Sequence, residues 1–148
     1  MTAHGGEAEV RAATDADIDP ILALWGQAGM PADTDEARDD LARTRAHDTG
    51  LVLVAELDER VVGTVTGSWD GRRGWIMRLA VEPPARRRGV ASALVAEVEA
   101  RLRARGATQV NLLVFAENRD ALAFWRECGY RSMAPVVLLT RRVDDPSA

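Results

Sequence analysis

Three strand-like runs follow one another between residues 51 and 81, with only short turns between them. Val, Leu, Ile and Thr are frequent in these runs, which cover residues 51–57, 61–69 and 75–81. The second turn, DGRRG at residues 70–74, is rich in residues that favour tight turns. Connections this short join antiparallel neighbours, so the sequence predicts an antiparallel meander.

Two helices are predicted before the meander, after a first strand over residues 7–12. Thr14 and Asp17 have the spacing of a capping box, and apolar residues then repeat at helical spacing at Ile18, Ile21, Leu22 and Trp25. A second, acidic helix is predicted from residue 33 to about residue 46. It has few apolar residues, so we expect it on the surface.

After the meander, helices and strands alternate. A helix over residues 89–105 carries the apolar stripe Val90, Leu94, Val98 and Leu102. A strand over residues 108–115 follows, then a helix capped by Asn118 that ends near Cys128, and a last strand over residues 135–143. The strand–helix–strand unit from residue 75 to residue 115 should be parallel, with a right-handed crossover.

The predicted order is therefore β-α-α-β-β-β-α-β-α-β. This order indicates an α/β (α+β) fold with a mixed central sheet of about six to seven strands and four flanking helices. The length of 148 residues fits a single domain over residues 1–148. Residues 1–6 and 144–148 are expected to be flexible tails.

The composition argues against several classes of function. The net charge of -4 and the acidic pI of about 5.2 do not favour nucleic-acid binding. The apolar runs are too short to span a bilayer, and no secretory signal is visible. With Cys128 as the single cysteine, no intrachain disulfide can form, and we expect a cytoplasmic protein with no membrane partner and no metal site.

The stretch VEPPARRRGVA, residues 81–91, places three arginines before a helix. Cations at a helix N-terminus oppose the helix dipole, so an anion between them would resolve the conflict. Gly89 and Ala91 would let that anion approach the backbone N–H groups closely. The stretch predicts a phosphate or pyrophosphate site, the alternative being a solvated basic loop.

This stretch resembles the coenzyme A pyrophosphate motif of the GNAT (GCN5-related N-acetyltransferase) superfamily, Gln/Arg-x-x-Gly-x-Gly/Ala. Arg86, Gly89 and Ala91 fill its defining positions, and Val81 and Pro83 match the Val-x-Pro that precedes it. A second motif of the superfamily also matches, at Asn118, Ala121, Phe124 or Trp125, and Gly129-Tyr130. The order of elements agrees with that of the superfamily over nearly the whole chain, so the resemblance implies the GNAT fold.

The resemblance implies that acetyl-CoA is the acyl donor and that it lies where two central strands splay apart, after Val81 and near Phe115. Main chain at Leu79, Ala80 and Val81 would pair with the pantetheine arm, and an N–H there would polarise the thioester carbonyl. The implied cofactor-binding residues are Leu79, Ala80, Val81, Arg86, Arg87, Arg88, Gly89, Val90, Ala91, Ser92, Asn118 and Trp125.

The catalytic side chains usual in the superfamily are not present at the matching positions. Trp125 stands where many relatives have a Tyr acid, and Met77 and Arg78 stand where many carry an acidic base. The candidates that remain as general base are Glu117 and Glu82, with Asp70 as a third carboxylate. Each is equally compatible with a surface position.

The predicted function is N-acetyl transfer to a primary amine of a small molecule or a protein by direct attack. The alternative is an acyl-CoA-binding module with weak or no catalysis. The acidic segment 32–40 is interpreted as a solvated helix face, or as a field that attracts a cationic amine, and Trp25 as a core residue rather than an acceptor-site wall. The acceptor, the acyl-chain preference and the choice between monomer and homodimer stay open.

Overall fold

The computed structural model describes residues 7–144. The chain divides into two units, Met1–Leu113 and Val114–Ala148, which are described separately. The expectation of flexible tails at 1–6 and 144–148 falls, apart from residue 144, outside the described residues.

A five-stranded mixed sheet forms the centre of the first unit. Its strands are β1 (Glu9–Ala12), β2 (Val52–Leu57), β3 (Arg60–Trp69), β4 (Gly74–Val81) and β5 (Val110–Asn111). They lie side by side in sequence order, the first four antiparallel and β5 parallel to β4. The predicted meander and the parallel strand–helix–strand unit are both confirmed.

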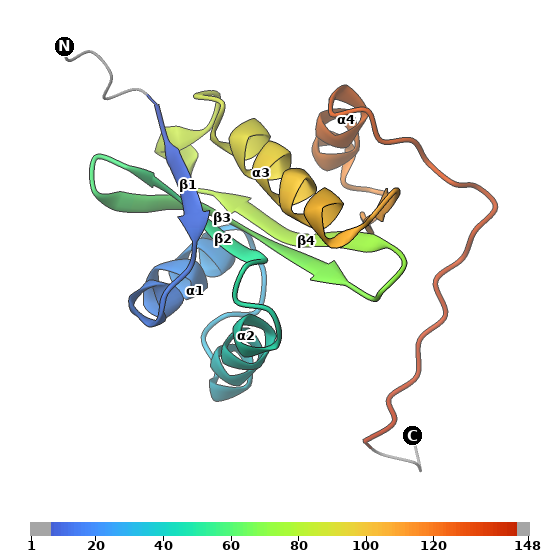
Figure 1. Cartoon of the computed structure of the whole chain (residues 1–148), viewed down its shortest axis with the longest axis horizontal. Coiled ribbons are helices and arrows are strands. Elements are labelled where there is room, and N and C mark those ends of the chain that lie inside the picture. The colour runs from blue at the N-terminus through green and yellow to red at the C-terminus, as the bar shows by residue number, and fades with distance from the viewer. Residues whose placement is uncertain (1–6, 145–148) are drawn as a thin grey trace. The chain divides into compact units, whose positions relative to one another are not determined.

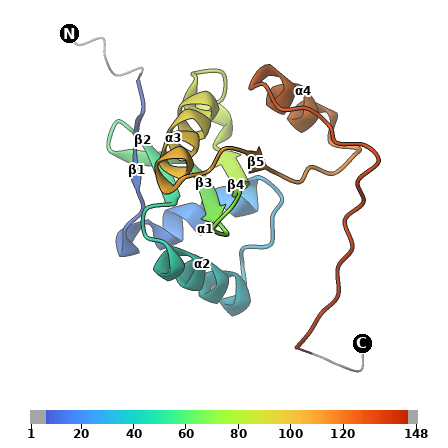
Figure 2. The same ribbon diagram turned by 45° about the vertical axis from the view of Figure 1, so that its right-hand side comes forward.

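Three helices cover the two faces of this sheet: α1 (Ile18–Gln27), α2 (Asp35–His47) and α3 (Val90–Arg105). Figures 1 and 2 show α3 on one face and α1 with α2 on the other. The residue limits agree with the predicted helices to within two positions. The apolar stripe of α3 is buried, as its periodicity predicted.

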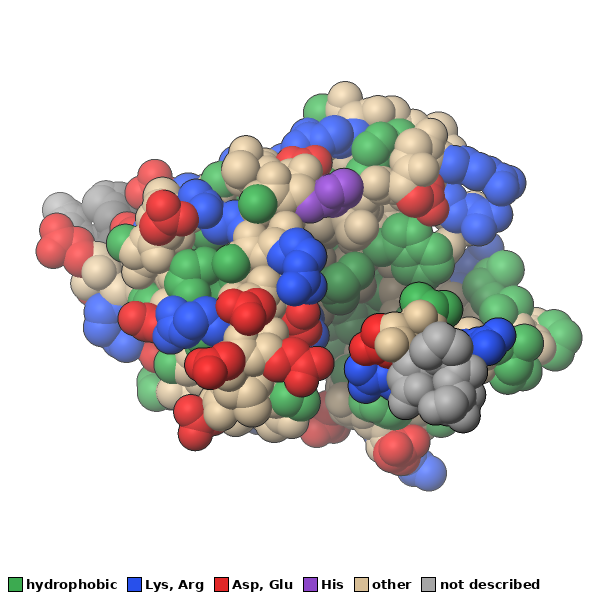
Figure 3. Space-filling model, turned by 90° about the horizontal axis from the view of Figure 1, so that it is seen from below, with side chains coloured by type: hydrophobic (Ala, Val, Ile, Leu, Met, Phe, Trp, Pro, Cys, Tyr) green, Lys and Arg blue, Asp and Glu red, His purple; other side chains and the backbone are tan. Residues whose placement is uncertain are grey.

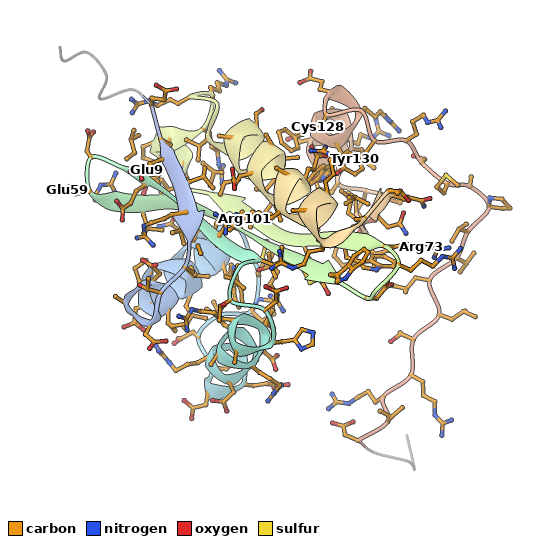
Figure 4. The ribbon with its side chains drawn as sticks, in the orientation of Figure 1. Glu9, Glu59, Arg73, Arg101, Cys128 and Tyr130 are labelled. Carbon is orange, nitrogen blue, oxygen red and sulfur yellow. The ribbon has the colours of Figure 1, made fainter. Side chains whose placement is uncertain are left out.

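The face under α3 is built for close approach. A Cβ at Gly67 would lie 2.6 Å from Val98 Cγ2, and one at Gly74 would lie 2.9 Å from Leu102 Cδ1. Arg101 at the far end of α3 donates to Glu97 and to the carbonyl oxygen of Gly50 (Figure 4). These contacts fix α3 against the strands whose ends carry the candidate site.

The opposite face holds a core shared by α1, α2 and the sheet, with Ile21, Trp25, Leu41, Val52 and Val54 among its buried members. Just before α1, Asp17 fixes the chain. Its carboxylate accepts hydrogen bonds from Arg11 at 2.7 and 3.1 Å and from the Thr14 N–H at 2.7 Å. The last contact is half of the capping box expected from the sequence.

The strand count of six to seven is too high. The predicted strand 108–115 is reduced to Val110–Asn111, and 135–143 forms no strand in the described part of the chain. Four apolar side chains of the latter segment, from Val136 to Leu139, are exposed. High β-propensity gives a strand only where a neighbouring strand accepts the backbone hydrogen bonds, so propensity alone overestimated the sheet.

The second unit contains α4 (Arg119–Glu127). Asn118 caps it as predicted, because its Oδ1 accepts from the N–H of Ala121 at 3.1 Å. Trp125 is buried and makes edge-to-face contacts with Phe124 and Tyr130, at centroid distances of 5.1 and 5.2 Å. Cys128 is the C-cap of this helix, and Tyr130 follows two residues later (Figure 4).

Among residues 7–144, no helix is long and apolar enough to cross a membrane. Within the same range, no group of three or more His, Cys, Asp and Glu side chains is arranged to hold a metal ion.

Candidate functional site

The turn between β4 and α3 carries the arginine-rich stretch. Pro83–Ala85 form one turn of 3-10 helix, and the Arg86 side chain donates from Nε to the carbonyl oxygen of Val81 at 3.0 Å. Arg87 and Gly89 both have left-handed backbone, with φ of 68° and 78°. These left-handed residues turn the chain between the 3-10 helix and α3, which begins at Val90.

The helix begins one residue later than predicted. It was expected from residue 89, but Gly89 is the N-cap in left-handed conformation and Val90 is the first helical residue. A left-handed residue cannot continue a right-handed helix, so Arg87 and Arg88 belong to the turn before it. Arg88 also has an interaction partner, so it is not a free side chain of this turn.

The first turn of α3 offers N–H groups to a ligand. Those of Val90, Ala91 and Ser92 donate to no acceptor within residues 7–144. A Cβ added at Gly89 would meet nothing within 4 Å, so the space beside this backbone is open. Unpaired N–H groups, the positive end of the helix dipole and open room fit a phosphate or pyrophosphate group.

One edge of β4 is free over its last residues. On one side β4 pairs with β3 up to Val81, but on the other its ladder with β5 ends at Trp75. From Ile76 to Val81 the backbone groups on that edge therefore have no strand partner in the described chain. The predicted thioester-binding segment Leu79, Ala80 and Val81 lies on this free edge and runs into the arginine-rich turn.

A bulge interrupts β4 where that segment begins. Thr64 pairs with Ala80 and Thr66 with Met77, so Arg78 and Leu79 together oppose the single residue Val65. Arg78 has a φ of 55°, unusual for a residue with a side chain. In a regular strand Met77 and Arg78 would face opposite sides of the sheet; here both line one cavity.

The candidate bases Glu82 and Asp70 are both held by local partners. The Glu82 carboxylate accepts from Arg60 at 2.7 and 3.1 Å, and this contact raises the pKa of Arg60. Asp70 accepts from the N–H groups of Arg73 and Arg72, and its pKa is lowered by these hydrogen bonds. A carboxylate with a lowered pKa is a weaker proton acceptor, so the geometry favours a turn-stabilising role for Asp70.

Three other sequence-predicted residues, Glu117, Asn118 and Trp125, belong to the second unit. The Glu117 side chain is exposed, and its backbone oxygen accepts from the N–H of Arg119. The structure therefore brings Leu79–Val81 and the arginine-rich turn together in the first unit and leaves these three with the second.

Sequence reasoning missed a cavity of about 200 Å³ on the face of α1 and α2. It is lined by Trp25, Asp40, Leu41, Arg43, Thr44, Thr66, Met77 and Arg78. Trp25 is a core residue, as expected, with 2% of its surface exposed, and it is also a wall of this cavity. The signal available in the sequence was Arg78, a charged residue in the otherwise apolar run WIMRLAV.

Comparison with known proteins decides the family. The model of the Acetyltransferase (GNAT) family matches residues 17–130. The chain belongs to the GNAT family. This membership confirms the predicted superfamily, and with it an acetyl-CoA-dependent N-acetyltransferase.

Relatives and solved structures agree with this assignment. A protein of Sodalis glossinidius (strain morsitans) named as an acetyltransferase is 33% identical over 135 residues, 91% of this chain and 95% of its own. Ard1 from Thermoplasma volcanium has a TM-score of 0.78 at 23% identity, covering 86% of this chain and 84% of its own. AAC(6')-Iy, in complex with the bisubstrate analogue CoA-S-monomethyl-acetylneamine, has a TM-score of 0.77 at 19% identity, covering 92% of this chain and 99% of its own. At these identities the two structures show that the fold is shared.

Proposed function

We propose that this GNAT enzyme transfers the acetyl group of acetyl-CoA to a primary amine of a small molecule or a protein by direct attack. One observation carries the proposal: the free edge of β4 from Ile76 to Val81 runs directly into a turn with unpaired N–H groups. An extended amide-containing arm that ends in a pyrophosphate matches this succession. AAC(6')-Iy, captured with a bisubstrate analogue that contains CoA, supports a site for donor and acceptor together.

In this proposal the backbone does most of the binding. Main chain at Leu79, Ala80 and Val81 pairs with the pantetheine arm, and the N–H groups of Gly89, Val90, Ala91 and Ser92 hold the pyrophosphate. Arg86, Arg87 and Arg88 add positive charge around it. The Arg86 bond to the Val81 carbonyl oxygen fixes the turn to the end of the pantetheine-binding edge.

The reaction needs orientation and two proton movements. The amine nitrogen forms the new C–N bond and loses a proton. The C–S bond breaks, and the sulfur leaves with the electron pair and takes up a proton. An N–H of the β4 edge stabilises the charge on the carbonyl oxygen. Glu117 and Glu82 stay the candidate proton acceptors, and Asn118 and Trp125 the candidate coenzyme contacts of the second unit.

Binding without efficient transfer is the second candidate function. It is favoured by Trp125, because an indole N–H is not a useful acid at neutral pH, and by the pairing of Glu82 with Arg60. The cytoplasmic location and the choice between monomer and homodimer stay predictions.

Two measurements on the purified full chain separate these functions. Calorimetry with acetyl-CoA tests the site, and a panel of amines with detection of released CoA thiol tests transfer. We expect binding and turnover. If acetyl-CoA does not bind, both functions are contradicted. If it binds but no amine in the panel releases CoA thiol, the acyl-CoA-binding module is the function that remains.

A further inference from the structure

The cavity beside α1 and α2 has a wall of hydrogen-bond donors. It lies wholly within the first unit, between α1, α2, β3 and β4, and holds about 200 Å³. Cavities that take drug-sized ligands are larger, about 300 Å³ upwards. This one therefore suits a small molecule or the end of a side chain.

Arg78 supplies most of these donors. Its guanidinium carbon lies 4.3 Å from the centre of the Trp25 ring, a stacked cation–π contact. Within residues 7–144 its N–H groups make no hydrogen bond and no ion pair. A guanidinium stacked on a ring keeps the donors along its edges available, and their fork matches the two oxygens of a carboxylate.

Trp25 forms the support under this guanidinium. Its Nε1 is the one buried side-chain nitrogen or oxygen of the described chain that has no hydrogen-bond partner, and it has less than 1 Å² of accessible surface. A ligand in the cavity therefore does not reach this nitrogen. Trp25 contributes its ring, and Arg78 contributes the donors.

The charges around the cavity also favour an anion. Asp40 is the only acidic side chain among the lining residues, and it pairs with Arg43 at 3.1 Å. The charge of Arg78 is left uncompensated. Acidic and basic side chains lie close together on the side of the molecule that Figure 3 shows. Segment 32–40 was interpreted as a solvated helix face or as a field that attracts a cationic amine, and of its acidic side chains only Asp40 lines the cavity.

The position of Arg78 links the cavity to the chemistry. The β4 bulge turns its side chain into the cavity, and the next residue, Leu79, begins the proposed thioester-binding edge. A carboxylate held by Arg78 would place an amine on the same molecule close to that edge. This step rests on the proposed function.

We propose that the cavity selects an amino-acid-like acceptor, a small primary amine that also carries a carboxylate. Arg78 binds the carboxylate with its guanidinium fork, and the Trp25 ring beneath it holds that guanidinium in place. Polycationic amines without a carboxylate are poor acceptors in this arrangement.

The test compares amines that differ only in the carboxylate. Acceptor pairs are L-lysine with cadaverine, L-ornithine with putrescine and glycine with methylamine, each assayed by released CoA thiol with the full chain. We expect the carboxylate-bearing member to have a kcat/KM about 10- to 100-fold higher, the range of a charged hydrogen-bonded pair. Arg78→Gln should abolish that ratio, and Trp25→Phe, which puts a smaller ring under the guanidinium, should reduce it. Arg72→Gln, on the exposed hairpin, is the control that keeps it.

Three outcomes overturn the inference: equal rates within pairs, preference for the polycations, or an unchanged ratio in Arg78→Gln. Acetyl-CoA calorimetry on each variant separates these from a failure of the proposed function. If CoA binds and no amine turns over, L-lysine and cadaverine are titrated into labelled protein while the Trp25 indole N–H resonance is followed. A shift of this resonance with L-lysine but not with cadaverine, absent in Arg78→Gln, supports the inference. No shift with L-lysine overturns it.

Discussion

The guanidinium of Arg60 at the start of β3 binds both oxygens of the Glu82 carboxylate, which follows the last residue of β4. The Glu82 side chain is 12% exposed and that of Arg60 is 64% exposed. The pair joins the two strands beside the candidate site. A carboxylate paired in this way has a structural role, and this weakens the case for Glu82 as the general base.

We therefore expect Glu82→Gln and Arg60→Gln to behave alike. Both break the same pair, so both should lose a little thermal stability and keep most of the wild-type kcat. Removing a general base costs roughly 10²–10⁴-fold in rate. A loss of that size in Glu82→Gln alone, together with loss of the acidic limb of the pH–rate profile, would instead make Glu82 the base. Glu117→Gln, assayed in parallel, tests the other candidate.

Gly89 is expected to be required for binding acetyl-CoA. Its left-handed backbone costs a residue with a Cβ about 1 kcal/mol, and that Cβ would point into the open space where the pyrophosphate is proposed. Gly89→Ala should weaken acetyl-CoA binding about tenfold or more, measured by calorimetry.

Gly71 provides the matched control, because it also has positive φ and no atom within 4 Å of an added Cβ, but lies in the β3–β4 hairpin. Gly71→Ala should lose similar stability and bind acetyl-CoA normally. Equal affinity in the two variants would contradict the proposed pyrophosphate site.

Trp125 tests whether the reaction needs an acid at this position. A thiol is acidic enough for its thiolate to leave without help, with a pKa of about 8.5 in an unperturbed cysteine. We expect Trp125→Tyr and Trp125→Phe to have the same kcat across the pH range, and both to lose stability because the contacts with Phe124 and Tyr130 shrink. A faster Trp125→Tyr variant, with a limb near the tyrosine pKa of about 10, would show that an acid is needed.

Local signals allowed most of the fold to be predicted. The periodicity of Val90 to Leu102 specified α3, and the short turn at residues 70–74 specified the β3–β4 hairpin. The cap at Asn118 follows from a hydrogen bond to a residue three positions away. Such features depend on neighbouring residues and so are visible in the sequence.

Features that depend on distant residues were not predictable. Glu82 meets Arg60, which is 22 residues away. Arg78 stacks on Trp25 only because a bulge turns it from the face that strict alternation would give it. The segment 135–143 has strand propensity but forms no strand among the described residues. In each case pairing between remote segments, rather than local preference, decides the outcome.

Asp17 should make stability depend on pH in acid. Its buried carboxylate accepts from Arg11 and Thr14, and the Arg11 contact holds its pKa below the ordinary value of 3.8. The ionised form is favoured in the folded state, so this stabilisation is complete above about pH 4–5 and is lost as the pH falls through the lowered pKa.

Asp17→Asn should cost about 1–3 kcal/mol at neutral pH, measured by urea denaturation, and this difference should shrink toward pH 2. Asp19→Asn is the control, because Asp19 is 79% exposed and pairs with Arg38 on the surface. It should leave the pH dependence unchanged. A penalty for Asp17→Asn that is constant with pH would mean that the carboxylate charge is not what stabilises this turn.

Gly67 should be intolerant of even one added methyl group. A Cβ there would lie 2.6 Å from Val98 Cγ2, because Gly67 in β3 faces Val98 in α3. Overpacking of this kind costs about 1–3 kcal/mol, so Gly67→Ala should lower the free energy of unfolding by that amount. Val98→Ala makes room, and the double variant should be more stable than the sum of the two single losses predicts. Additive losses in the double variant would mean that α3 moves away from the sheet instead of pressing on Gly67.

Gly26→Ala in α1 is the contrasting case, because its added Cβ would lie 3.9 Å from Ala32 Cβ and the chain is helical there. This variant should raise the free energy of unfolding by about 0.5–1 kcal/mol.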